Sequence, residues 1–260
     1  MNTVAIAGVG LIGGSFALAL RKAGFQGRII GVSSPATIDK AFSRGVIDEA
    51  LPLAEAAAAA DLVYLSQPIS QIIETLKRLD TDALITDAGS TKAVICETAR
   101  KLKRGRFVGG HPMAGKESRG VEQADADLFR GRPYVLTSRE PELESWIERI
   151  GARLVILDPV DHDRQVAFVS HLPQLLSTTL ASVLAGKEQV AGPAAADLTR
   201  LALSPYDIWR DIFATNAGPI DAALTAFIGK LEERRTRLRS PEMEQAFTQA
   251  AASARALRGK

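Results

Sequence analysis

The chain has 260 residues, of which 46% are hydrophobic, with 32 basic and 30 acidic side chains and a formal net charge of +2. This length can bury one large core or two smaller ones, and we expect two domains. The near-neutral charge gives no basis for nucleic-acid binding, and we find no uninterrupted apolar run long enough to span a bilayer.

The single cysteine, Cys96, cannot form a disulfide within the chain, which is typical of proteins in reducing compartments. The first residues carry no basic region followed by a long apolar core, so we expect no signal peptide. The sequence therefore predicts a cytoplasmic protein with no membrane, nucleic-acid or metal partner.

A strand, a tight glycine turn and a helix open the chain. The apolar run from Val4 to Ala7 is followed by glycines with the spacing of a dinucleotide-binding turn, namely Gly8, Gly10 and Gly13. In such turns the first glycine permits the sharp bend, the second lets the backbone approach a pyrophosphate, and the third lets helix and strand pack closely. A helical pattern follows from Phe16, and the amino terminus of that helix would receive the phosphate charge.

The second strand, over 29–32, ends at Ser33 and Ser34, where NAD-binding folds usually place an acidic residue for the ribose 2′-hydroxyl. Hydroxyl groups tolerate a 2′-phosphate that a carboxylate would repel, and Lys40 or Arg44 on the next helix could lie nearby. This pattern favours NADP over NAD. If the serines only cap the next helix, no preference follows.

Strands and helices continue to alternate. We expect helices over 51–60, 69–79, 91–102 and 142–150, with strands over 61–66, 84–87, 107–110, 134–137 and 154–157. Ser66 and Pro68 would lie at the carboxyl edge of the sheet, where ligands bind in open α/β folds, and Ser90 would cap the helix that follows it. The sequence thus predicts an α/β Rossmann dinucleotide-binding domain over 1–157, with the cofactor contacts Gly8, Gly10, Leu11, Ile12, Gly13, Ser33, Ser34, Ser66 and Pro68.

A glycine-bracketed turn over 109–122 carries His111. The strand before it would deliver this histidine to the same edge of the sheet, where a turn histidine is placed for acid–base chemistry. A lone loop histidine is more often a surface residue. This one follows the segment Gly89-Ser90-Thr91-Lys92 and precedes two further histidines, which favours a functional role.

Beyond His162 the strand patterns end and helical patterns replace them. We expect Pro173 to bend the first helix. A core histidine is usually buried and bonded to a backbone carbonyl, and we expect this of His171 more than of His162. Further helices are expected over 194–203, from Ser204 as cap through Trp209, over 220–238 and over 243–257. Their apolar faces exceed what a small domain can cover, so the sequence predicts an all-α dimerisation domain over 158–260 and a homodimer.

These segments, in this order, resemble the prephenate/arogenate dehydrogenase family of tyrosine biosynthesis, from about Val4 to Asn216. They are the glycine turn, Asp87 to Lys92, the His111 turn, His162-Asp163 and Ser170-His171-Leu172-Pro173. The resemblance implies a Rossmann domain followed by a helical dimerisation domain. It also implies oxidative decarboxylation of prephenate to 4-hydroxyphenylpyruvate, or of L-arogenate to L-tyrosine, with NAD(P) as hydride acceptor.

The resemblance also implies roles for individual residues. His111 would accept a hydrogen bond and eventually the proton of the ring 4-hydroxyl, and Ser90 would orient that hydroxyl or the nicotinamide. Arg200 would pair with a substrate carboxylate. The remaining substrate-binding positions would be His162, Ser170, Gln174, Lys116, Glu117 and Trp209, although Trp209 could equally be a core residue.

Two residues depart from the family pattern. Gln174 stands where many prephenate-using members have a histidine, and Lys116 stands where Ser or Thr is frequent. A neutral glutamine tolerates the amine of arogenate better than a cation would, which favours arogenate use, alone or with prephenate.

Other functions remain open at this point. One is a related β-hydroxyacid or imine-reducing dehydrogenase, which usually relies on a lysine or an acid of the helical domain. Another is an NADP-binding redox sensor without turnover. The presence of His111, Ser90 and Arg200 together favours the enzyme.

Overall fold

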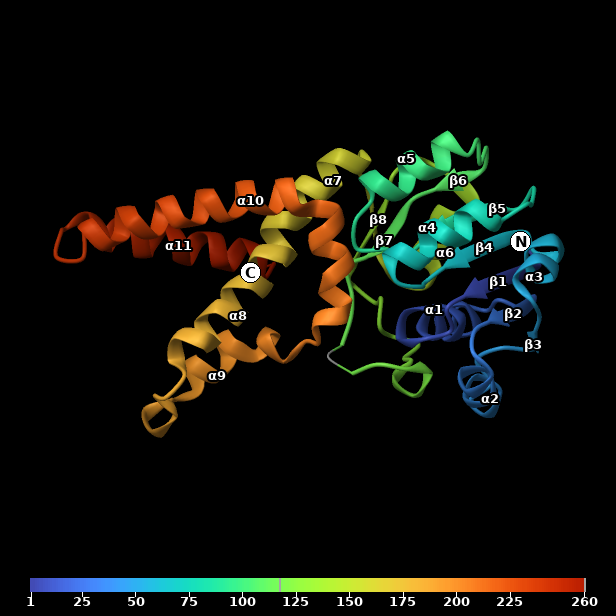
Figure 1. Ribbon diagram of the computed structural model, residues 1–260, viewed down its shortest axis with the longest axis horizontal. Helices are drawn as coiled ribbons and strands as arrows, with labels where there is room; N and C mark the ends of the chain where they lie inside the picture. The colour runs from blue at the N-terminus through green and yellow to red at the C-terminus, as the bar shows by residue number, and fades with distance from the viewer. Residues whose placement is uncertain (117, 260) are drawn as a thin grey trace.

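The computed structural model describes residues 1–116 and 118–259, and its amino-terminal half is a parallel sheet with helices on both faces (Figure 1). Alternate residues of the first strand enter different cores, because successive side chains of a strand point to opposite faces. Ile6 lies in the core that α1 covers, whereas Ala5 lies in the core that α4 covers. The expected Rossmann architecture is confirmed.

The sheet has six strands in the order β3-β2-β1-β4-β5-β6. They are β1 (Thr3–Ala7), β2 (Arg28–Val32), β3 (Glu49–Ala50), β4 (Leu62–Leu65), β5 (Leu84–Asp87) and β6 (Phe107–Val108). The connecting helices are α1 (Leu11–Lys22), α2 (Pro35–Ser43), α3 (Leu53–Ala59), α4 (Ile69–Arg78) and α5 (Ala93–Lys101). The strand order reverses between β1 and β4, which creates the crevice at which such folds bind ligands.

The strands after β6 form a separate sheet, a division that the expected strand pattern did not indicate. This sheet has the order β7-β8-β9 and consists of β7 (Gly110–Pro112), β8 (Pro133–Leu136) and β9 (Arg153–Ile156), with α6 (Pro141–Arg149) between the last two. The chain changes sheets at Gly109, whose carbonyl accepts from the amide of Thr137 at 2.9 Å. His111 therefore lies within a strand, paired with Val135, and not on a turn as predicted.

From Pro159 to residue 259, the end of the described chain, every regular element is a helix. The first stretch runs through α7 (Pro159–Val166), a π-helical turn (Ala167–His171) and α8 (Leu172–Leu184) without a break. Pro173 has no amide hydrogen, so the regular bonding pattern cannot run through it, and the wide turn lies immediately before it. By length and composition Pro159–Leu184 could cross a membrane, which the sequence analysis did not anticipate, although core helices of soluble proteins meet the same criterion.

The remaining helices are α9 (Pro193–Thr199), followed by the 3-10 turn Arg200–Leu203, then α10 (Tyr206–Thr236) and α11 (Glu242–Leu257). Figure 1 shows two projections, in which α8 pairs with α9 and α10 pairs with α11. The expected break before residue 220 is a kink within α10 at Asn216, where φ is −129° and ψ is 22°. Ser204 does not cap α10 as predicted, because its hydroxyl accepts from the indole of Trp209 at 2.9 Å.

Polar contacts fix the helical half against the sheet. The carboxylate of Asp163 on α7 accepts from the amides of Lys92 at 2.7 Å and Ala93 at 2.9 Å, so it caps α5 from the other domain. The predicted capping role of Ser90 is therefore wrong. Asp211 on α10 likewise accepts from the amide of Ser70 on α4 at 2.8 Å. These bonds connect the two domains directly.

Candidate functional site

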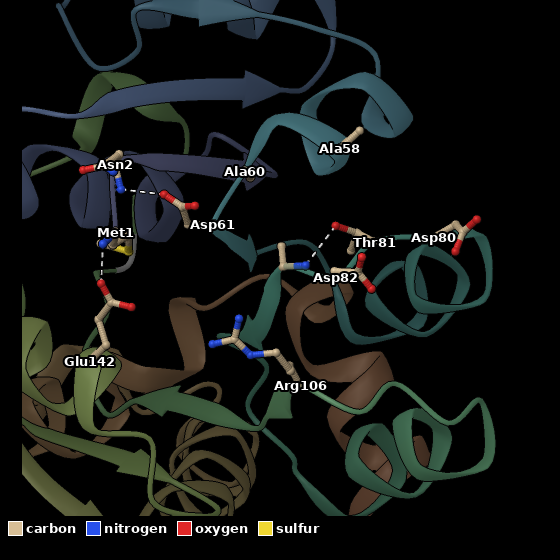
Figure 2. A pocket seen from close by; sticks show the side chains of 11 residues that line it. Met1, Asn2, Ala58, Ala60, Asp61, Asp80, Thr81, Asp82, Arg106 and Glu142 are labelled. Atoms are coloured by element: carbon tan, nitrogen blue, oxygen red, sulfur yellow. Dashed lines mark hydrogen bonds and ion pairs between the residues drawn. The ribbon is translucent and has the colours of Figure 1, made fainter.

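A polar cavity of about 620 Å³ lies at the amino ends of the strands (Figure 2). Its carboxylates already serve the local structure. Asp61 accepts from the amides of Asn2 at 2.6 Å and Thr3 at 3.0 Å, and Glu142 pairs with the amino group of Met1. Because open α/β sheets bind ligands at the opposite edge, we give this cavity no role in the activity.

A second cavity, of about 430 Å³, lies between the two domains at the carboxyl ends of β1 and β4. The nucleotide-binding side contributes the glycine turn and the loop after β7, and the helical side contributes the first turns of α10. Among the residues predicted as functional, this cleft brings together Gly10, Leu11, Ile12, Ser66, Pro68, Ser90 and Lys116.

The glycine turn has the close contacts expected of a dinucleotide site. A Cβ on Gly13 would come within 2.4 Å of the Gly8 carbonyl, and one on Gly8, where φ is +95°, within 2.8 Å of the Ser66 carbonyl. Gly10 differs, because a Cβ there would meet no atom of the described protein within 4 Å. It is the N-cap of α1, which begins at Leu11 and not near Phe16, and no side chain of the described residues caps it. The turn therefore holds open space beside a positive helix end.

The serines after β2 are exposed and line a neighbouring cavity of about 560 Å³, together with Gly10, Ser66 and Pro68. The hydroxyl of Ser34 lies 3.0 Å from that of Thr37. The two cations considered for this region bond elsewhere: Lys40 pairs with Glu122, and Arg44 donates to the carbonyl of Ala124 at 3.1 Å.

A buried ion pair joins the Ser90 loop to the His111 strand. Asp87, the last residue of β5, and Lys92 are both fully buried and pair with each other. The Asp87 carboxylate also accepts from the amides of Gly89 at 2.8 Å and Gly110 at 3.1 Å. Lys92 in turn donates to the Gly110 carbonyl at 2.7 Å. One carboxylate thus holds the turn before Ser90 beside the strand that carries His111.

The histidines meet at the boundary of the two domains. His111 Nδ1 lies 2.8 Å from His162 Nε2, and His162 Nδ1 lies 2.8 Å from Asp163 Oδ1. His171 Nδ1 lies 3.1 Å from the side-chain amide nitrogen of Asn216. In the described part of the chain, neither His162 nor His171 bonds to a backbone carbonyl, so that expectation is wrong.

Burial favours the neutral forms of His111 and His171. It lowers the pKa of His111 well below the usual range, and the nearby His162, Lys92 and His171 lower it further. Burial also lowers the pKa of His171 to about 4. A buried cation costs free energy unless it is compensated, so at pH 7 His111 is an uncharged imidazole that can accept a proton.

Two of the predicted substrate-binding residues lie in the helical domain, Gln174 on α8 and Arg200 in the turn after α9. Gln174 is buried and donates to the carbonyl of Leu201 at 2.9 Å, while the amide of Ala202 donates to Ser177 at 3.0 Å. These bonds hold the 3-10 turn that begins at Arg200 against α8. Arg200 itself is exposed.

The other predicted residues are less closely grouped. Lys116 pairs with Asp125 at 3.0 Å, and Glu117 lies outside the described residues. Ser170 is partly buried in the π-helical turn. Trp209 packs edge to face on His171 with ring centroids 6.0 Å apart, and it also contacts Phe213.

Two family models cover nearly the whole chain. Residues 16–158 match the nucleotide-binding domain of prephenate dehydrogenase, and residues 158–250 match its dimerization domain. The chain belongs to the prephenate dehydrogenase family.

Individual relatives agree with this assignment. The chain is similar to the prephenate dehydrogenase of Lactococcus lactis, with 38% identity over 231 residues that span 83% of this chain and 65% of that protein. The chain thus spans slightly less than two thirds of this relative's length.

Solved structures of the family superpose closely. The prephenate dehydrogenase of A. aeolicus in complex with hydroxyphenyl propionate and NAD+ has a TM-score of 0.88 at 31% identity, covering 99% of this chain and 98% of that one. The arogenate dehydrogenase of Synechocystis has a TM-score of 0.82 at 30% identity, covering 97% and 98%.

Four residues of this family member's site escaped the sequence analysis as functional candidates: Asp87, Lys92, Asp163 and Asn216. Each acts through a partner that is distant along the chain, as when Asn216 donates to the Asp163 carbonyl at 2.9 Å. The ion pair had a local signal in the sequence. A buried strand ends in Asp87, and Lys92 follows five residues later, after Gly89-Ser90-Thr91. No comparable local pattern marks Asn216.

Proposed function

We propose that this chain oxidatively decarboxylates a cyclohexadienol, either prephenate or L-arogenate, with a nicotinamide cofactor as hydride acceptor. The observation that carries the proposal is His111. It is neutral, 8% exposed and hydrogen-bonded at Nδ1, and it follows Gly110, whose amide donates to Asp87 just before the Ser90 loop that lines the interdomain cleft. A base of this kind suits proton removal from the ring 4-hydroxyl.

The protein's part in the reaction is acid–base chemistry and positioning. His111 accepts the hydroxyl proton as C4 loses its hydride and becomes a carbonyl carbon. The bond from C1 to the carboxylate then breaks to release carbon dioxide, its electron pair enters the ring, and the proton returns to the oxygen of the phenol. Ser90 orients the hydroxyl or the nicotinamide, and Arg200 pairs with the carboxylate of the substrate's side chain.

The glycine turn fits the pyrophosphate of a dinucleotide. The space over Gly10 and the uncapped start of α1 suit an anion, which the helix dipole and free amides would favour. A bound nicotinamide would supply the hydride acceptor, next to Ser66, Pro68 and Ser90 on the cleft wall. Leu11, Ile12 and Gly13 would lie beneath the phosphates.

The residues after β2 would determine whether the protein binds NAD or NADP. Ser33 and Ser34 present hydroxyls and no carboxylate, which keeps NADP as our proposal. Lys40 and Arg44 already have protein partners, so they provide less support for a 2′-phosphate than the sequence suggested.

Gly10→Ala tests the position of the cofactor. Because the added methyl group meets no described protein atom within 4 Å, we expect an unchanged Tm. The methyl group would occupy the space of the pyrophosphate, so the KM for NAD(P) should rise about tenfold or more, by analogy with the close approach that this glycine permits. Gly229→Ala on α10, which also has open space, is the matched control and should leave that KM unchanged. An equal KM in both variants would contradict the placement.

The substrate preference turns on Gln174. Its amide nitrogen donates to Leu201 and, at 3.3 Å, to Thr178, so the group that it offers a ligand is the acceptor Oε1. An acceptor can bind the ammonium of arogenate but gains nothing from the keto group of prephenate. We therefore propose that arogenate is used, alone or in addition to prephenate.

Two substitutions of Gln174 should change the preference for arogenate over prephenate in opposite directions. Gln174→Glu should raise the ratio of kcat/KM for arogenate to that for prephenate by about tenfold, since hydrogen bonds to charged groups contribute about 1.5–3 kcal/mol. Gln174→His should lower the same ratio. Steady-state kinetics with both substrates measure it, and a ratio that both variants leave unchanged would remove Gln174 as a determinant.

We also propose that the chain is a cytoplasmic homodimer. The helical domain exposes apolar side chains that a second copy could cover, namely Val183, Ile228, Leu231, Leu238, Phe247 and Leu257. The partner copy could then cover Val183, which lies in the apolar stretch Pro159–Leu184.

The decisive experiment is steady-state reduction of NAD and of NADP, each with prephenate and with arogenate. Turnover of at least one cyclohexadienol supports the proposed reaction, and the pair with the highest kcat/KM identifies substrate and cofactor. Cofactor binding without turnover of either substrate would favour the redox sensor. A related β-hydroxyacid dehydrogenase would instead turn over hydroxyacids and neither cyclohexadienol.

A further inference from the structure

All three histidines of the chain lie at the domain boundary, and two of them form a hydrogen-bonded row with a carboxylate. The row runs from His111 through His162 to Asp163, with 2.8 Å between the nitrogens and 2.8 Å from the second ring to the carboxylate. Their exposed fractions are 8%, 0% and 3%. Because His162 is fully buried behind His111, we expect it to position His111 in place of the predicted contact with the substrate.

The carboxylate determines where each proton of the row lies. It can only accept, so the ring of His162 carries its proton on Nδ1 and presents a bare Nε2. The ring of His111 must then donate from its own Nδ1, which leaves its lone pair on Nε2. Two backbone amides, of Lys92 and Ala93, also donate to Asp163 and orient it.

We propose that Asp163 and His162 are positioning residues that hold His111 as a neutral base with its proton on Nδ1. The proposal rests on the proposed function, in which His111 is the base. When the hydroxyl proton reaches Nε2, His111 becomes a cation, and the charge of Asp163 offsets it through the row. When the phenol forms, the proton leaves Nε2 again and the row returns to its starting state.

Of the charged and polar groups around the row, Asp163 is the one that can offset a positive charge on His111. Lys92 approaches from the start of α5, but it is paired with the buried Asp87. His171 approaches from the π-helical turn and is neutral at pH 7, while Asn216 from α10 contributes an uncharged amide. Asp163 is the negative group of this set that directly faces the histidines.

Asp163→Asn is the critical variant, because an amide cannot accept from His162 and both backbone amides at once. The donor side of the amide would force a different tautomer on the rings. We expect kcat to fall by about two to three orders of magnitude, a smaller loss than that of a wrong-tautomer histidine in a serine protease. The KM for substrate should change less than threefold, since no ligand contact is removed.

The tautomers can be read directly by NMR of protein labelled with ¹⁵N-histidine, because the chain has three histidines. We expect His111 in the unmodified protein to carry its proton on Nδ1, and a shift toward the Nε2-protonated ring in Asp163→Asn. Loss of the α5 cap alone would lower Tm without changing the tautomer, so the two roles of Asp163 separate.

Three further variants serve as controls. Asp161→Asn removes the same charge from α7, at an exposed residue whose carboxylate contacts Arg164 at 3.3 Å, and it should leave kcat and the tautomers unchanged. His162→Gln keeps an acceptor for the Nδ1 proton of His111, whereas His162→Leu removes it. We expect the glutamine variant to retain at least tenfold more activity than the leucine variant.

An unmodified His111 protonated on Nε2 would overturn the proposal, as would a normal kcat in Asp163→Asn. Failure of the proposed function gives a different pattern, because turnover of both cyclohexadienols would then be absent while the NMR measurement still determines the tautomer of His111.

Discussion

His111→Asn should lower kcat by about two to four orders of magnitude, the usual loss when a general base is removed. Asparagine keeps a hydrogen-bonding side chain of similar reach but cannot take the proton of the ring 4-hydroxyl. Substrate and cofactor affinity should change little, because the contacts attributed to Arg200 and the glycine turn remain. Single-turnover absorbance of the reduced nicotinamide measures the chemical step.

The pH profile provides an independent check on the same residue. Because the pKa of His111 lies well below 6.5, its neutral form persists into mildly acidic solution. We expect kcat/KM to stay level from pH 7 to below pH 6.5 and to fall only as the pH drops through the lowered pKa. Activity that was already lost at pH 6.5, or a turnover number in His111→Asn equal to that of the unmodified enzyme, would contradict the assignment.

Lys92→Met should destabilise the protein by about 3–5 kcal/mol, the usual cost of leaving one partner of a buried ion pair uncompensated. Lys92 and Asp87 are both fully buried, and removing the ammonium also removes the donor to the Gly110 carbonyl. Since Asp87 holds the His111 strand beside the Ser90 loop, activity should fall as well. Urea denaturation at one fixed protein concentration measures the free energy of unfolding.

Lys22→Met is the matched control, because its pair with Asp127 is about half exposed and should contribute less than about 1 kcal/mol. The double variant Asp87→Asn/Lys92→Met should be more stable than Lys92→Met, since it leaves no buried charge. Burial already raises the pKa of Asp87 despite Lys92. A carboxyl whose folded pKa is raised favours unfolding above that pKa, so the deficit of Lys92→Met should shrink as pH falls. Equal losses in Lys92→Met and Lys22→Met would contradict this account.

The candidate site was predictable where its residues form a local pattern. The glycine turn follows from three glycines at fixed spacing between a strand and a helix, and the structure has the close contacts that this spacing requires. His111 was identified from its motif, yet its setting was wrong. The prediction gave it a turn at the edge of one sheet, whereas it pairs with Val135 in a second sheet. That pairing joins segments more than 20 residues apart, which periodicity cannot reveal.

Local sequence thus determined the parallel Rossmann sheet, the helical second half and the family, because strand and helix periods and tight turns depend on residues near one another in the chain. The tertiary structure decided which polar groups meet. Asp163 caps α5 and bonds to His162, and Asn216 donates to Asp163 and His171 across a kinked helix. These bonds exist because buried polar groups must find partners wherever the packed fold brings them, at separations that no local pattern encodes.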